Sequence, residues 1–201
     1  MGKNKETPEI RREKLRQGEL KNPSSSIHGS NLADLVGGLN WKVFGILILV
    51  IIIGGVYLLL RFNPPLEFGA EYTTEDNKSA VVGVGNNGFR EVEILNVSVN
   101  NNENPLETKL QVSNPLKGFI ITDNYNSEEA KEYGFTNINE VALKTGTSPS
   151  TTYEKQDEGI ASKDDEIYGI SVIHNEAIYN IHIEYSHFGM TFNDTIYLNM
   201  D

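Results

Sequence analysis

The sequence predicts one membrane-spanning α-helix followed by an all-β domain, an antiparallel immunoglobulin-like β-sandwich outside the cytoplasm. Residues 43–60 form a run of 18 residues without a charged side chain. Residues 62–201 instead contain short runs of β-forming residues separated by clusters of turn residues, which is typical of sandwiches and barrels. The chain of 201 residues has no cysteine, so such a domain must be stable without disulfides.

The overall composition excludes several classes of function. Lys and Arg total 17 and Asp and Glu total 28, which gives a formal net charge of −11. A nucleic-acid-binding protein needs a positive field that replaces the counterions around phosphates, so we expect no nucleic-acid partner. The lack of cysteine also excludes thiolate metal sites and a cysteine nucleophile.

Residues 1–41 are predicted to form a basic cytoplasmic tail. Residues 1–42 contain eight basic and five acidic side chains, whereas residues 43–201 contain nine basic and 23 acidic ones. A basic excess beside a span marks its cytoplasmic side, and here the excess comes from the cluster at residues 3–21. The sequence therefore predicts the N-terminus inside and the acidic C-terminal domain outside.

Two helices are predicted within this tail. Thr7 is a typical N-cap residue, and Pro8 suits the first helical position, so a short polar helix should begin there. Nearer the span, an apolar face recurs at helical spacing and predicts a short amphipathic juxtamembrane helix lying in the interface; its members are Leu32, Leu35, Val36 and Leu39.

Residues 42–61 are predicted to form the transmembrane helix of a single-pass cell-membrane protein. A helix of the uncharged run alone spans roughly 27 Å, close to the ~30 Å of bilayer hydrocarbon. Trp41 and Tyr57 suit the interface, and Lys42 and Arg61 can reach the headgroups. The long preceding tail and the lack of a small-residue cleavage pattern favour an uncleaved signal anchor over a signal peptide.

Several short motifs connect the tail and the span to a known kind of protein. They include Glu6-Thr7-Pro8-Glu9, Asp34-Leu35-Val36-Gly37 and Trp41-Lys42. With these motifs, roughly residues 6–62 resemble a family of small, uncharacterised single-span membrane proteins of bacilli. The resemblance implies a membrane protein of a Gram-positive bacterium, but it implies no activity and no site residues, and it does not extend to the C-terminal domain.

Residues 62–201 are predicted to form the extracytoplasmic β-sandwich domain. We expect about nine strands, the first six at 67–73, 79–85, 92–100, 108–113, 117–122 and 138–144, and the last three as an antiparallel meander within 166–200. In the meander, Ile181, Ile183 and Tyr185 alternate with polar residues, which predicts one buried and one wet face. A helical turn is expected after residues 126–131, and a long mobile loop at 145–165.

The sequence contains no recognisable catalytic constellation, so we expect no catalytic, cofactor-binding or metal-binding residues and no cofactor. The histidines match no zinc motif and are expected on the solvated surface; they are His28, His174, His182 and His187. Gly83-Val84-Gly85 stops short of a dinucleotide fingerprint. The acidic stretch 157–166 has two interpretations, a weak calcium site or a solvated acidic surface.

Three functions are consistent with this organisation. The favoured one is a non-catalytic binding or sensing module, tethered to the lipid bilayer and presenting loops to an envelope protein. The second is a hydrolase of a cell-envelope polymer that uses paired surface carboxylates. In the third, residues 3–21 of the tail recruit a partner or lipid, and the outer domain is passive. The first is favoured because a stalk at 63–65 and a compact domain come without catalytic residues.

Overall fold

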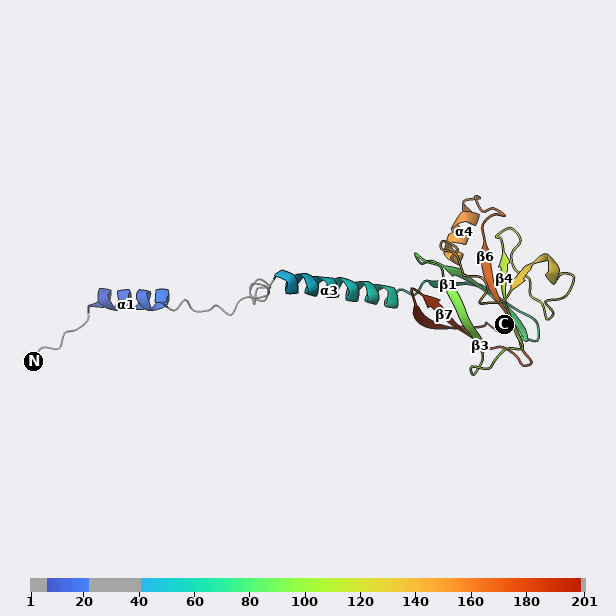
Figure 1. The fold of residues 1–201 in the computed structure, drawn as a ribbon, viewed down its shortest axis with the longest axis horizontal. Helices are drawn as coiled ribbons and strands as arrows, with labels where there is room; N and C mark the ends of the chain where they lie inside the picture. Colours follow the sequence, from blue (N-terminus) through green and yellow to red (C-terminus); the bar gives the residue numbers. More distant parts are fainter. Residues whose placement is uncertain (1–6, 22–40, 200–201) are drawn as a thin grey trace, which may run out of the picture. The chain divides into compact units, whose positions relative to one another are not determined.

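The computed structural model describes residues 7–21 and 41–199 (Figure 1). The chain divides into two units, residues 1–56 and residues 57–201, and every strand among the described residues belongs to the second. The predicted juxtamembrane helix at residues 32–39 and His28 lie outside the described residues.

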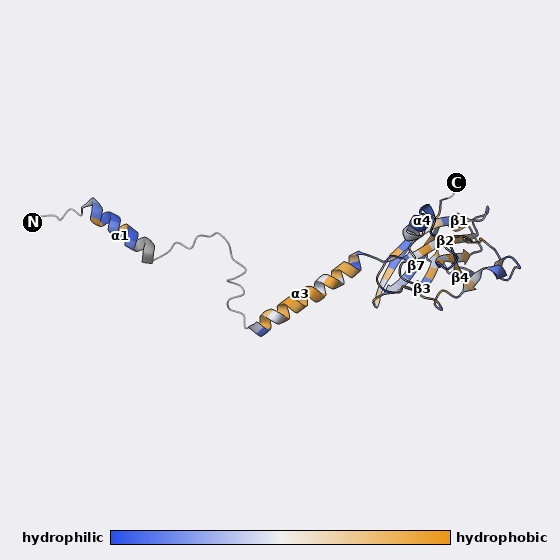
Figure 2. Cartoon of the chain, turned by 90° about the horizontal axis from the view of Figure 1, so that it is seen from above, coloured by the Kyte–Doolittle hydropathy of each residue, from blue (hydrophilic) through white to orange (hydrophobic). Residues whose placement is uncertain are grey.

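The first described elements are two helices of opposite character. α1 (Pro8–Lys21) begins at the predicted proline and is mainly hydrophilic, whereas α3 (Trp41–Phe62) is hydrophobic along most of its length (Figure 2). α3 has 22 residues, and none of them is buried against the rest of the protein. It is therefore long and apolar enough to cross a membrane, as the uncharged run predicted.

The domain that follows consists of two antiparallel sheets. The five-stranded sheet has the order β1-β2-β6-β4-β5, and the three-stranded sheet has the order β3-β7-β8. The strands are β1 (Leu66–Thr73), β2 (Ser79–Asn86), β3 (Glu93–Val99), β4 (Glu107–Ser113), β5 (Gly134–Thr136), β6 (Ile167–Ile173), β7 (Asn180–His187) and β8 (Met190–Tyr197). The prediction of a mostly antiparallel β domain is confirmed.

One hydrophobic core joins the two sheets. The predicted alternation in β7 is confirmed, since Ile181, Ile183 and Tyr185 are buried in this core while the residues between them are partly exposed. β2 differs, because all eight of its residues are buried. A strand buried on both faces must be covered on the side away from the core as well.

The predicted meander at 166–200 is wrong. β7 and β8 form a hairpin, but β6 pairs with β2 and β4 in the other sheet. The connection between β6 and β7 is not a tight turn, because the fully buried Ile178 lies within it. The chain passes there from one sheet to the other.

Three further local predictions are corrected. Residues 117–122 and 138–144 form no strand, and the short β5 was not predicted, so the described residues contain eight strands instead of nine. The second segment contributes only a bridge between Val92 and the buried Leu143.

The predicted loop 145–165 contains a helix, α4 (Pro149–Asp157). The helical turn expected in this region is present as a short 3₁₀ helix, η1 (Ala130–Glu132), and Ser127 Oγ, three residues before it begins, accepts from the Ala130 N–H at 3.1 Å.

Candidate functional site

The face of the five-stranded sheet that points away from the core is covered by chain lying very close to it. Glycines on β2 and β6 permit this approach. A Cβ on Gly85 would lie 2.0 Å from the Thr147 carbonyl oxygen, and one on Gly169 would lie 3.0 Å from a ring carbon of Phe119. Glycine inside a strand is typical of such close backbone approach. Two segments, one around Phe119 and one around Thr147, therefore lie directly on this face.

The first covering segment, residues 115–122, is held by a buried side chain of β4. Gln111 is fully buried, its Nε2 donates to the Ile120 carbonyl oxygen at 3.3 Å, and its Oε1 accepts from the Ile120 N–H at 3.1 Å. A side-chain amide offers the same donor and acceptor as a peptide group, so Gln111 takes the place of a neighbouring strand. Ser113 Oγ adds a 2.6 Å hydrogen bond to the Gly118 carbonyl oxygen.

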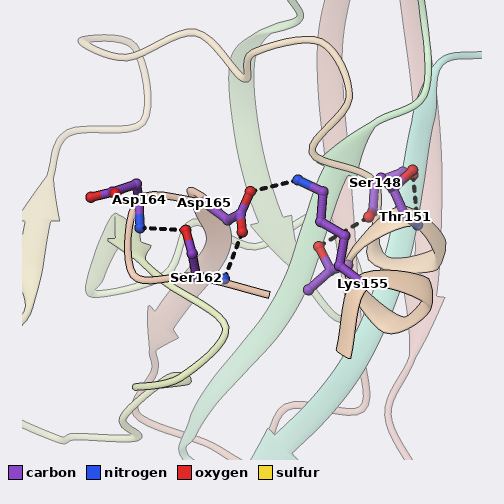
Figure 3. Close-up of polar contacts among 7 residues, drawn as sticks. Ser148, Thr151, Lys155, Ser162, Asp164 and Asp165 are labelled. Atoms are coloured by element: carbon purple, nitrogen blue, oxygen red, sulfur yellow. Dashed lines mark hydrogen bonds and ion pairs between the residues drawn. The ribbon is translucent and has the colours of Figure 1, made fainter. Parts of the chain in front are cut away.

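The second covering segment is α4. The buried Ser148 caps it by accepting from the Thr151 N–H at 3.3 Å (Figure 3), and Pro149 occupies the first turn. The carboxylate of Glu67 on β1 accepts from both the N–H and the hydroxyl of Ser150, at 2.8 and 3.0 Å. These bonds fix the N-terminal turn of α4 to the edge of the sheet.

The chain after α4 is also held in place. Lys155 Nζ donates to Asp165 at 2.5 Å, and the Ser162 N–H donates to the other oxygen of that carboxylate at 2.8 Å (Figure 3). The segment predicted as a mobile loop thus folds back on its own helix. A Ser-Pro pair before a helical stretch is the usual N-terminal signal, so Ser148-Pro149 could have predicted α4.

Between the two covering segments lies an open cleft of about 730 Å³. Its floor is made of small residues of β1 and β2, and its sides come from residues 115–121 and from α4. The principal lining residues are Gly69, Ala70, Gly83, Phe119, Ile120, Ile121, Pro149, Thr152, Tyr153 and Gln156. None of the lining residues carries a charged side chain at neutral pH.

The cleft has a few polar groups at its margin. Tyr72 and Tyr153 line it and are half exposed, at 50% and 48%. Gln156 Nε2 donates to the Pro115 carbonyl oxygen at 3.2 Å and so links the two covering segments. An apolar surface with a few hydroxyl and amide groups can bind an uncharged ligand and orient it through hydrogen bonds.

The acidic stretch 157–166 contains carboxylates that are already paired. Glu166 accepts from Lys144 Nζ at 2.7 Å and from the Tyr168 hydroxyl at 2.6 Å. Hydrogen bonds from lysine lower the pKa values of Glu166 and Asp165, because they stabilise the charged form. A general acid needs the opposite shift, so neither Asp165 nor Glu166 is tuned to act as one. Within residues 7–21 and 41–199, no three His, Asp or Glu side chains are grouped to hold a metal ion.

The prediction that the histidines are solvated is wrong for His187. Its side chain is only 3% exposed, and burial lowers its pKa. His182 lies on the polar face of β7 as predicted, between the Thr195 hydroxyl at 2.8 Å and the Asn100 carbonyl oxygen at 2.7 Å. The prediction is also wrong for His174, whose side chain is only 9% exposed and lies 3.3 Å from the carboxylate of Glu103.

Comparison with known proteins bears on the N-terminal part alone. Residues 1–61 match the model of a family of unknown function, DUF6366. The match covers less than a third of the chain and includes no residue of the β domain. No curated protein and no solved structure shows significant similarity to the chain.

Proposed function

We propose that this protein is a single-pass membrane protein of a Gram-positive bacterium, with its N-terminus in the cytoplasm and its β domain outside. A helix of 22 residues extends roughly 33 Å, enough to cross the hydrocarbon layer. The basic tail before α3 and the acidic domain after it favour this orientation. The match to the family of unknown function ends at residue 61, one residue before α3 ends, in keeping with the resemblance to single-span proteins of bacilli.

We infer that the domain is an immunoglobulin-like sandwich. In constant-type immunoglobulin domains the first, second, fifth and fourth strands form one sheet and the third, sixth and seventh form the other. The orders β1-β2-β6-β4 and β3-β7-β8 follow this scheme when β5 is counted as an added edge strand. This fold presents loops and sheet faces for binding, and it carries many unrelated functions.

The function that this geometry supports best is that of a non-catalytic extracytoplasmic binding module. The observation that carries the proposal is the cleft between residues 115–121 and α4. Its volume of about 730 Å³ falls among those of small-molecule sites, and its apolar lining with a few polar groups has their usual character. The ligand we infer is an uncharged, largely apolar group of small-molecule size. An envelope protein that binds here would have to present such a group.

Uncharged and charged fluoroaromatic fragments test this proposal. The full-length protein is placed in lipid nanodiscs, and binding of 4-fluoroanisole and 4-fluorobenzoate is followed by broadening of their fluorine NMR signals, with empty nanodiscs correcting for partition into lipid. We expect saturable broadening of the uncharged fragment alone.

Two substitutions on α4 provide the matched pair for this experiment. Gln156→Trp places a bulky ring at a lining position, whereas Glu154→Trp adds the same ring at an exposed position of α4 that does not line the cleft. Binding should weaken in the first variant and persist in the second. Equal binding by both variants and the unmodified protein, or no saturable binding at all, contradicts the proposal.

A further inference from the structure

The turn between β7 and β8 contains an unusual residue. It has two residues, Phe188 and Gly189, and both have positive φ, 51° and 72°. Two-residue hairpin turns with this backbone favour Asn-Gly or Asp-Gly, because a bulky side chain is disfavoured in the left-handed region. Phe188 is 43% exposed, so burial in the core does not account for it. A residue with a disfavoured backbone conformation in an exposed turn points to a role in binding.

A second exposed phenylalanine lies beside this turn. Phe89, in the connection from β2 to β3, is 92% exposed. The residue after it, Arg90, is the only arginine in residues 62–201, and its guanidinium carbon lies 5.7 Å from the ring centre of Phe188. This cation–π contact brings the two loops together. Phe89, Arg90 and Phe188 form one surface, the aromatic tip.

The aromatic tip adjoins the residue at which the chain enters the domain. The Asn87 N–H donates to the Pro65 carbonyl oxygen at 2.8 Å. A Cβ on Gly88 would lie 2.6 Å from Pro65 Cβ and 3.0 Å from His187 Cε1, so Gly88, the residue before Phe89, lies against both Pro65 and the residue before Phe188. Two residues, Asn63 and Pro64, separate Pro65 from the end of α3 at Phe62, and the chain from Phe62 to Pro65 extends at most about 10 Å. The tip therefore stays close to the end of the apolar helix in any orientation of the domain.

We propose that the aromatic tip docks on the membrane–water interface of the bilayer that α3 spans. Phe89 and Phe188 insert at headgroup level, where aromatic rings are favoured, and Arg90 binds lipid phosphate. The remainder of the domain is strongly acidic and would avoid an anionic surface, so docking at the tip also orients the domain. This inference rests on the proposed membrane location of α3.

Fluorescence quenching by brominated lipids tests the docking. The full-length protein is reconstituted in vesicles of phosphatidylcholine and phosphatidylglycerol whose acyl chains carry bromine near the headgroup. The single native tryptophan is removed by Trp41→Phe, and Phe89→Trp or Tyr179→Trp then supplies a reporter. Tyr179 is a matched control because it is 56% exposed but precedes β7 at the end opposite Phe188, roughly 30 Å away along the strand.

We expect the reporter at position 89 to lose most of its fluorescence and the reporter at position 179 to keep it. Adding Phe188→Asn, which suits the turn and removes one of the two rings, should reduce the quenching at position 89. Equal fluorescence at both positions overturns the docking proposal. In the unmodified protein, Trp41 reports on α3 itself. If Trp41 is not quenched the membrane location is wrong, whereas quenching of Trp41 without quenching at position 89 refutes only the docking.

Discussion

Replacing Gln111 with leucine tests whether one side chain holds a wall of the cleft. Leucine has a similar volume, so Gln111→Leu largely preserves packing, but the N–H and carbonyl of Ile120 lose their 3.1 and 3.3 Å partners. A buried polar group without a partner costs about 1–3 kcal/mol. Ile120 is only partly buried, and water reaches its backbone more easily than in the core. We therefore expect the two losses together to lower the free energy of unfolding by about 2–4 kcal/mol.

Urea unfolding of the full-length protein, followed by circular dichroism of the β domain, measures this change. Lys109→Leu is the matched control: Lys109 is two residues earlier on the same face of β4 and makes an exposed 2.8 Å bond from its Nζ to Asn137. That substitution should change stability by less than about 0.5 kcal/mol. Amide exchange in residues 115–122 should accelerate only in the Gln111 variant. A Gln111→Leu protein as stable as the control would refute this role.

Three further predictions concern stability. Gly85→Ala places a Cβ 2.0 Å from the Thr147 carbonyl oxygen, so urea unfolding should show a loss of about 1–3 kcal/mol, and no loss would contradict the close approach. The pKa of Glu166 is lowered, chiefly by the hydrogen bond from Lys144, so Glu166 contributes stability that is present above pH 4.5 and is lost as the pH falls through its pKa in the folded protein. Glu166→Gln should therefore flatten this part of a plot of the urea midpoint of unfolding against pH. Burial lowers the pKa of His187, which predicts a loss of stability as the pH falls below 6.5, and His187→Gln should remove this loss. If the variant and the unmodified protein lose stability equally below pH 6.5, His187 is not the cause.

The elements that could be predicted from the sequence are those with a strong local pattern. The helix predicted at 42–61 agrees with α3 within one residue at each end, and the alternation of apolar and polar residues predicted the buried face of β7. These patterns depend on residues close together in the chain, because a helix or one face of a strand is defined by its own periodicity.

The errors concern contacts between distant segments. No local pattern states that β6 pairs with β2 and β4, since a hairpin-sized gap before β7 is equally consistent with a meander. Residues 117–122 have strand-like composition, yet their backbone bonds to the side chain of Gln111. The unbroken run of small and apolar residues at 79–85, with glycines at 83 and 85, was the available sequence signal of a covered outer face.

The proposed orientation of the chain across a membrane can be tested directly, because the sequence contains no cysteine. Two single-cysteine variants, Gln17→Cys on α1 and Lys163→Cys in the β domain, place a thiol at exposed positions on either side of α3. Intact cells are treated with a membrane-impermeant maleimide. We predict labelling of the thiol at position 163 in intact cells and of the thiol at position 17 only after permeabilisation. Labelling of position 17 alone, or of neither position until the cells are opened, would contradict an extracytoplasmic domain.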